Sequence, residues 1–182
     1  MPLDLLAAVR FLQGNGVKSV SIVGASMGGT LAEEALRLAN PRRAAKLTHP
    51  GRGAAAAKAL MGKALSSPPP AGGWVTFGVH TRANSRARRR ANPGEIDRVV
   101  FLAHGAYGTP QLLQVRKLFT VARNDIGPGN VPRLIRIQTQ YDLAPEPKEL
   151  IVLNGEAHAQ FLFDTDQAER LTREIIRFLA AP

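Results

Sequence analysis

The stretch VSIVGASMGGTLAEEAL constrains the fold more than any other part of the sequence. The short, β-branched segment 18–23 predicts a buried strand, and the segment 27–38 predicts a helix. Between the two, Ser26 lies on a sharp turn with Gly24 and Gly28 two positions to either side. Side chains at those two positions would collide across the turn, so we expect both glycines to be required. A strand that turns directly into a helix is the unit from which parallel α/β sheets are built.

The same alternation continues through the rest of the chain. We expect further strands at 97–103, 117–122 and 148–153, and further helices at 2–13, 131–144 and 165–180. Apolar residues recur at helical spacing in three of the helices: Leu5, Val9 and Leu12; Leu31, Ala35 and Leu38; Leu171, Ile175 and Phe178. Asn130 is placed to cap the helix that follows it, and Asp164 or Thr165 to cap the last helix. The pattern predicts an α/β fold, a parallel sheet flanked by helices.

Residues 41–92 differ from the rest of the chain in charge. They contain eleven Lys or Arg, no Asp or Glu, and the run SSPPPAGG. The remainder has 13 basic and 14 acidic residues, although the whole chain of 182 residues has a net charge of +10. Joining Asn40 to Pro93 restores an ordinary helix–loop–strand passage. We therefore expect a single domain over 1–182 that carries 41–92 as a poorly packed, dispensable insertion. Within it, WVTFGV at 74–79 could still pair with the edge of the first strand.

A serine hydroxyl needs a base to become a nucleophile, and histidine is the base expected here. Four histidines are present: His49, His80, His104 and His158. His158 follows the last predicted strand. Loops after parallel strands gather at one edge of a sheet, so His158 should lie at the same edge as Ser26. The alternative for His158 is an exposed loop histidine with no chemical role.

An acid that orients the histidine should also follow a strand. Asp125 follows the strand at 117–122 and opens a loop rich in glycine and proline. Asp142 falls within a predicted helix, and Glu156 is only two residues from His158, so the sequence favours Asp125. The chain order Ser26, Asp125, His158 is the order found in α/β-hydrolases.

The backbone N–H of Met27 is placed to stabilise negative charge beside Ser26, together with the positive end of the following helix. A glycine-rich turn after a strand also occurs in nucleotide-binding sites. Here no lysine or acidic partner stands where a nucleotide site needs one, so the sequence favours an oxyanion-binding turn.

On these residues the chain resembles the serine α/β-hydrolases, in the esterase-like group near dienelactone hydrolases and prolyl-oligopeptidase-type domains. The matching pieces are VSIVGASMGGT, GEIDRVVFLA, KLFTVARND, APEPKELIVLNGEAHAQFLF and REIIRFLAAP, which cover 1–40 and about 93–182. The resemblance implies a partial α/β-hydrolase fold and hydrolysis of a small-molecule ester through an acyl-enzyme. It further implies Ser26, Asp125 and His158 as a catalytic triad, with no metal or cofactor. The turn that carries Ser26 corresponds to the nucleophile elbow of this family, and serine rather than cysteine at this position favours an esterase.

The chain departs from that family at its start, which corresponds to the helix before the nucleophile strand. The family's N-terminal strands are then missing, as is the loop that supplies a second oxyanion N–H. Losing one such donor costs about 10²–10³ in rate. The nucleophile strand would also expose an edge through which copies could associate. We therefore expect weak esterase activity, or alternatively an inactive hydrolase-like fragment that needs a partner, or a binding protein that uses its basic insertion.

Composition bears on several other classes of protein. The chain has no cysteine, so disulfides and thiolate sites are excluded. No apolar run reaches the ~18 residues that span a bilayer, and the N-terminus lacks the features of a signal peptide, so we expect a cytoplasmic protein without membrane association. The arginine run at 82–90 has no interleaved aromatic residues, so we expect a solvated loop there rather than a segment that binds nucleic acid.

Overall fold

Five strands form one sheet in the computed structural model, which describes residues 2–39, 78–81, 96–108 and 110–181. Their order across the sheet is β2-β1-β3-β4-β7. The strands are β1 (Val20–Ala25), β2 (Gly78–Thr81), β3 (Arg98–Leu102), β4 (Arg116–Ala122) and β7 (Lys148–Leu153). β1, β3, β4 and β7 run parallel, whereas β2 runs antiparallel to β1. The predicted α/β class with a parallel sheet is confirmed.

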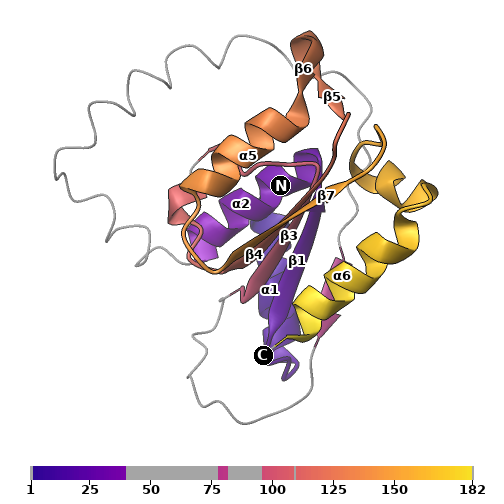
Figure 1. The fold of residues 1–182 in the computed structure, drawn as a ribbon. Helices are drawn as coiled ribbons and strands as arrows, with labels where there is room; N and C mark the ends of the chain where they lie inside the picture. Colours follow the sequence, from indigo (N-terminus) through magenta and orange to yellow (C-terminus); the bar gives the residue numbers. More distant parts are fainter. Residues whose placement is uncertain (1, 40–77, 82–95, 109, 182) are drawn as a thin grey trace, which may run out of the picture.

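Helices cover both faces of this sheet (Figure 1). α1 (Pro2–Gly14), α2 (Met27–Ala39) and α5 (Arg133–Leu143) pack on one face, and α6 (Ala168–Ala180) packs on the other. The shorter elements are the hairpin strands β5 (Ile126–Gly127) and β6 (Val131–Pro132) and the 3-10 turns η1 (Pro110–Leu112), η2 (Pro128–Asn130) and η3 (Ala159–Asp164). None of the helices in the described ranges is both long and apolar enough to cross a bilayer.

The central strands bury both of their faces, because successive side chains of a strand point to opposite sides of the sheet. In β3, Val99 and Phe101 belong to the core under α1, α2 and α5, whereas Val100 and Leu102 belong to the core under α6. β4 repeats the pattern, and its Phe119 stacks on Phe101 with ring centroids 5.2 Å apart. This double burial explains why residues 99–102 form a continuous apolar run in the sequence, whereas β4 also buries Lys117 and Thr120.

Apolar spacing located the buried faces of α1 and α6, but it was wrong for part of α2. The buried residues of α6 are the predicted Leu171, Ile175 and Phe178, together with Leu179. In α2, the predicted Leu38 is 44% exposed. The buried face of α2 consists mainly of small residues such as Ala32 and Ala35, which allow the helix to lie close to the sheet.

The predicted helix caps differ from the observed ones. Asn130 does not cap α5, because residues 126–132 form the β5–β6 hairpin and the helix begins only at Arg133. α6 begins at Ala168, and neither predicted residue is its N-cap. The hydroxyl of Thr165 instead accepts a hydrogen bond from the N–H of Gln167, one residue before the helix.

The outer edge of β1 carries β2, so the expectation of an exposed edge on the nucleophile strand is wrong. The two strands pair from Val20↔Thr81 to Val23↔Gly78. β2 overlaps the end of the WVTFGV piece and lies within 41–92, so part of this segment belongs to the sheet. The rest of 41–92, including the arginine run at 82–90, lies outside the described residues. Deletion of the whole segment would remove β2 from β1.

Candidate active site

Ser26 lies on the sharp turn between β1 and α2, as the sequence predicts. Its φ of 49° is in the left-handed region, which is strained for a residue with a side chain. Two backbone hydrogen bonds hold the turn: the Ser26 N–H donates to the Leu102 carbonyl of β3 (3.0 Å), and the Gly29 N–H donates to the Ser26 carbonyl (2.9 Å). The elbow is therefore anchored to both its neighbouring strand and its own helix.

The glycines around Ser26 are required by close backbone approach. A β-carbon added at Gly24 would lie 2.6 Å from the carbonyl oxygen of Gly28, so the two predicted glycines meet across the turn. Gly29 is also required, because of a contact with His104 that was not predicted from the sequence. A β-carbon there would lie 2.4 Å from the Cγ atom of the His104 ring. The double glycine at 28–29 was the signal that could have indicated it.

Ser26, His158 and Asp125 are joined by hydrogen bonds. His158 Nδ1 lies 2.8 Å from Asp125 Oδ2, and His158 Nε2 lies 3.0 Å from Ser26 Oγ. An ionised carboxylate can only accept, so the His158 proton is on Nδ1. Nε2 is then free of a proton and accepts from the Ser26 hydroxyl. This tautomer is the one that a general base needs in order to take the serine proton.

Extension of the β4–β7 pairing brings Asp125 and His158 together. Beyond the strands, the Arg123 N–H donates to the Leu153 carbonyl (2.8 Å) and the Asn124 N–H donates to the Gly155 carbonyl (3.0 Å). The loops after β4 and β7 are thereby held side by side at the same end of the sheet as the Ser26 turn. Asp125 is only 2% exposed.

The other candidates of the sequence analysis lie elsewhere. Asp142 is exposed on α5, where it accepts a hydrogen bond from Gln138. Glu156 is exposed in the loop before His158. His80 lies in β2, opposite Ser21, and His49 lies outside the described residues. Within the described ranges, no three His, Asp or Glu side chains are grouped as a metal site would need.

Met27 is the first residue of α2, directly after Ser26. Its N–H is one of the groups that an α-helix leaves without an intrahelical partner. These N–H groups and the helix dipole place partial positive charge at the N-terminus, beside the Ser26 hydroxyl. The position suits a negative charge that develops on an atom bonded to Ser26 Oγ.

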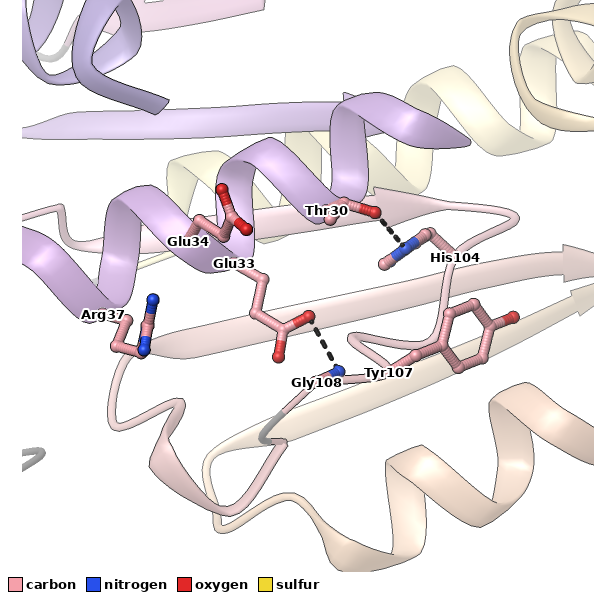
Figure 2. Close-up of a pocket in the computed structure, with 7 residues that line it drawn as sticks. All are labelled: Thr30, Glu33, Glu34, Arg37, His104, Tyr107 and Gly108. Carbon is pink, nitrogen blue, oxygen red and sulfur yellow. Dashed lines mark hydrogen bonds between the residues drawn. The ribbon is translucent and has the colours of Figure 1, made fainter. Parts of the chain in front are cut away.

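His104 ties the loop after β3 to α2 (Figure 2). Its Nδ1 accepts a hydrogen bond from the Ala106 N–H (3.0 Å), so its proton is on Nε2, which lies 3.1 Å from Thr30 Oγ1. Ala103 and Ala106, which flank the ring, have φ values of 52° and 54°. His104 thus braces the elbow helix rather than the Ser26 hydroxyl.

A cavity of about 220 Å³ lies along α2, beside the contact between His104 and Thr30. Figure 2 shows the residues that line it, including Glu33, which accepts a hydrogen bond from the Gly108 N–H at 3.2 Å. None of Ser26, Asp125 and His158 lines this cavity. It is therefore separate from the hydrogen-bonded triad, and its lining suggests no reacting group.

The buried His104 makes folding stability depend on pH. Burial, and then the positive charge of Arg133 and the proximity of His158, lower the pKa of His104 from 6.5 to about 4. The unfolded chain therefore binds a proton that the folded chain rejects between these two values. The contribution of neutral His104 to the free energy of unfolding is fully present above pH ~6.5. It is lost as the pH falls toward ~4, by up to about 3 kcal/mol.

Urea unfolding of the wild type and of His104→Asn at pH 7 and pH 4.5 measures this effect. Asparagine retains an acceptor for the Ala106 N–H but has no group that titrates in this range. We expect the wild type to lose more stability than the variant between the two pH values. Equal losses in both proteins would contradict a buried neutral His104.

No family model, no curated protein and no solved structure matches this chain.

Proposed function

We propose that the protein is a serine hydrolase that cleaves ester-type bonds of small molecules through an acyl-enzyme. The observation that carries the proposal is the continuous hydrogen-bonded relay Asp125–His158–Ser26, with separations of 2.8 and 3.0 Å. The buried carboxylate, the tautomer of His158 and the strained turn under Ser26 all favour an activated hydroxyl.

In the first half of the proposed reaction, Ser26 Oγ attacks the ester carbonyl carbon while His158 Nε2 takes the hydroxyl proton. Asp125 stabilises the imidazolium that forms. The carbonyl oxygen becomes negatively charged and is stabilised by the Met27 N–H and the N-terminus of α2. The C–O bond to the leaving group then breaks, and the imidazolium returns its proton to the departing alkoxide.

In the second half, water attacks the acyl group on Ser26. His158 takes a proton from this water and returns one to Ser26 Oγ as the acid departs, which restores the site. Only neutral His158 can act as the base, so the rate is expected to increase with pH as His158 loses its proton.

The arrangement also supports a serine α/β-hydrolase fold, which the sequence resemblance implied. Ser26, Asp125 and His158 follow β1, β4 and β7, and the chain passes between these parallel strands in that order. Helices on both faces and an elbow at the end of an inner strand are typical of that family.

A fluorophosphonate probe tests the proposal directly. Ser26 Oγ would attack phosphorus and displace fluoride, while His158 accepts the hydroxyl proton. We expect the wild type to gain one adduct on Ser26, detected by mass spectrometry of peptides, and Ser26→Ala to gain none. Ser21→Ala, which removes a buried hydroxyl of β1, is the matched control and should label like the wild type. A wild type that stays unlabelled would favour the alternative of an inactive hydrolase-like fragment.

A further inference from the structure

We infer that Arg133 is a positioning residue for this site, which holds Asp125 toward His158 and offsets part of its negative charge. The inference rests on the proposed function, because Asp125 acts there only through His158. The contact of Arg133 with Asp125 was not predicted from the sequence, because it depends on the β5–β6 hairpin, whose residues 131–132 were assigned to a helix.

The two oxygens of the Asp125 carboxylate have different partners. Oδ2 accepts from His158 Nδ1 at 2.8 Å, and Oδ1 accepts from Arg133 Nε at 3.0 Å. The carboxylate is 2% exposed and the Arg133 side chain is 21% exposed. Buried charged groups are normally paired and hydrogen-bonded, and Arg133 occupies the carboxylate oxygen that His158 leaves free.

The backbone fixes Arg133 in the same place. The Arg133 N–H donates to the Asp125 carbonyl at 2.8 Å, so the residue meets Asp125 through both main chain and side chain. Between them the chain forms the β5–β6 hairpin, paired at Ile126↔Pro132 and Gly127↔Val131. Arg133 therefore closes the base of this hairpin, and the arrangement leaves the Asp125 side chain little freedom to rotate.

The charge of Arg133 also acts on its surroundings. Among the described residues, Asp125 contacts His158, Arg133 pairs with the other oxygen of Asp125, and His104 on the loop after β3 interacts electrostatically with His158. The pKa of His104 is lowered first by burial and then by the positive charge of Arg133.

Removal of the charge and removal of the hydrogen bond can be separated by two variants. Arg133→Gln loses the charge, whereas Arg133→Lys keeps it but loses the planar guanidinium. Arg136→Gln is the matched control, because Arg136 is an exposed residue of α5 whose guanidinium lies over the Tyr107 ring at 5.1 Å. The rate of fluorophosphonate labelling is measured from pH 5 to 9, and circular dichroism of the same samples gives the folded fraction.

For Arg133→Gln we expect the plateau labelling rate to fall about tenfold to a hundredfold, because a loosened Asp125 no longer orients His158. The midpoint of the pH profile should rise, because the variant lacks the positive charge that pairs with Asp125. Arg133→Lys should keep the wild-type midpoint and lower only the plateau. Arg136→Gln should change neither.

The inference is overturned if Arg133→Gln matches the wild type in plateau and midpoint, or if Arg136→Gln produces the same changes. It is also overturned if the rate loss equals the loss of folded protein. NMR titration of the His158 ring in the wild type and in Arg133→Gln gives the midpoint without any need for labelling. A wild type that is not labelled therefore refutes the proposed function, while the titration still decides whether Arg133 acts on His158.

Discussion

The Asp125→Asn variant is expected to lose turnover of p-nitrophenyl acetate down to the background, a loss of as much as about 10⁴-fold. An asparagine would retain the size of Asp125 but could present an amide N–H toward His158 Nδ1. The imidazole would then carry its proton on Nε2, facing Ser26, and could no longer accept the serine proton. Arg133 would lose its ionised partner at the same time.

Asp142→Asn is the matched control, because Asp142 is the exposed acid on α5 that competes with Asp125 in the sequence. It should retain the turnover of the wild type. Steady-state kinetics of the two variants, read beside Ser26→Ala, decide the assignment. Equal losses in Asp125→Asn and Asp142→Asn, or full turnover in Asp125→Asn, would show that Asp125 does not orient the base.

Gly24→Ala should damage both the site and the stability of the fold. The added methyl group would lie 2.6 Å from the Gly28 carbonyl oxygen, 2.8 Å from its carbonyl carbon and 2.9 Å from the Gly29 nitrogen. All three atoms belong to the backbone, so the collision can be relieved only if the elbow moves. We expect a loss of about 1–3 kcal/mol in the free energy of unfolding. We also expect an approximately hundredfold slower fluorophosphonate labelling, since the Ser26 hydroxyl shifts away from His158.

Gly14→Ala provides the comparison for this variant. Gly14 ends α1, and a β-carbon there would meet nothing within 4 Å. Its stability should stay within about 0.5 kcal/mol of the wild type, and its labelling rate should be unchanged. Urea unfolding and labelling of both variants give the two readouts. A Gly24→Ala protein that behaves like Gly14→Ala would mean that the elbow tolerates a side chain at this position.

The strands, the main helices and the convergence of Ser26, Asp125 and His158 could be predicted from the sequence. Apolar runs buried on both faces of the sheet are visible in the chain itself, and parallel strands place the loops after them at one edge. A triad of side chains far apart in the sequence could therefore be assembled from strand positions alone.

Contacts that depend on how neighbouring elements approach one another could not be predicted. Gly29 is required because the His104 ring lies against it, and this ring arrives on a loop some seventy residues later. The bond from Arg133 to Asp125 depends on the β5–β6 hairpin, whose residues were assigned in part to a helix. From the sequence, the helix was expected to begin at residue 131. In the molecule, Val131–Pro132 form β6, and α5 begins at Arg133.

Several residues other than glycine have a left-handed backbone conformation, and this affects how thermostable variants should be selected. Ser26, Ala103, Ala106 and Ala159 all have φ between 49° and 55°, and all lie in the loops around or beside the triad. Each such residue costs on the order of 1–3 kcal/mol, so these loops hold backbone strain. Glycine could relieve the three alanines, but not Ser26, whose hydroxyl is the proposed nucleophile. Selection for heat resistance alone would favour Ser26→Gly as well as changes at the alanines, and Ser26→Gly ends the proposed chemistry. A screen for thermostable variants therefore has to select for labelling as well.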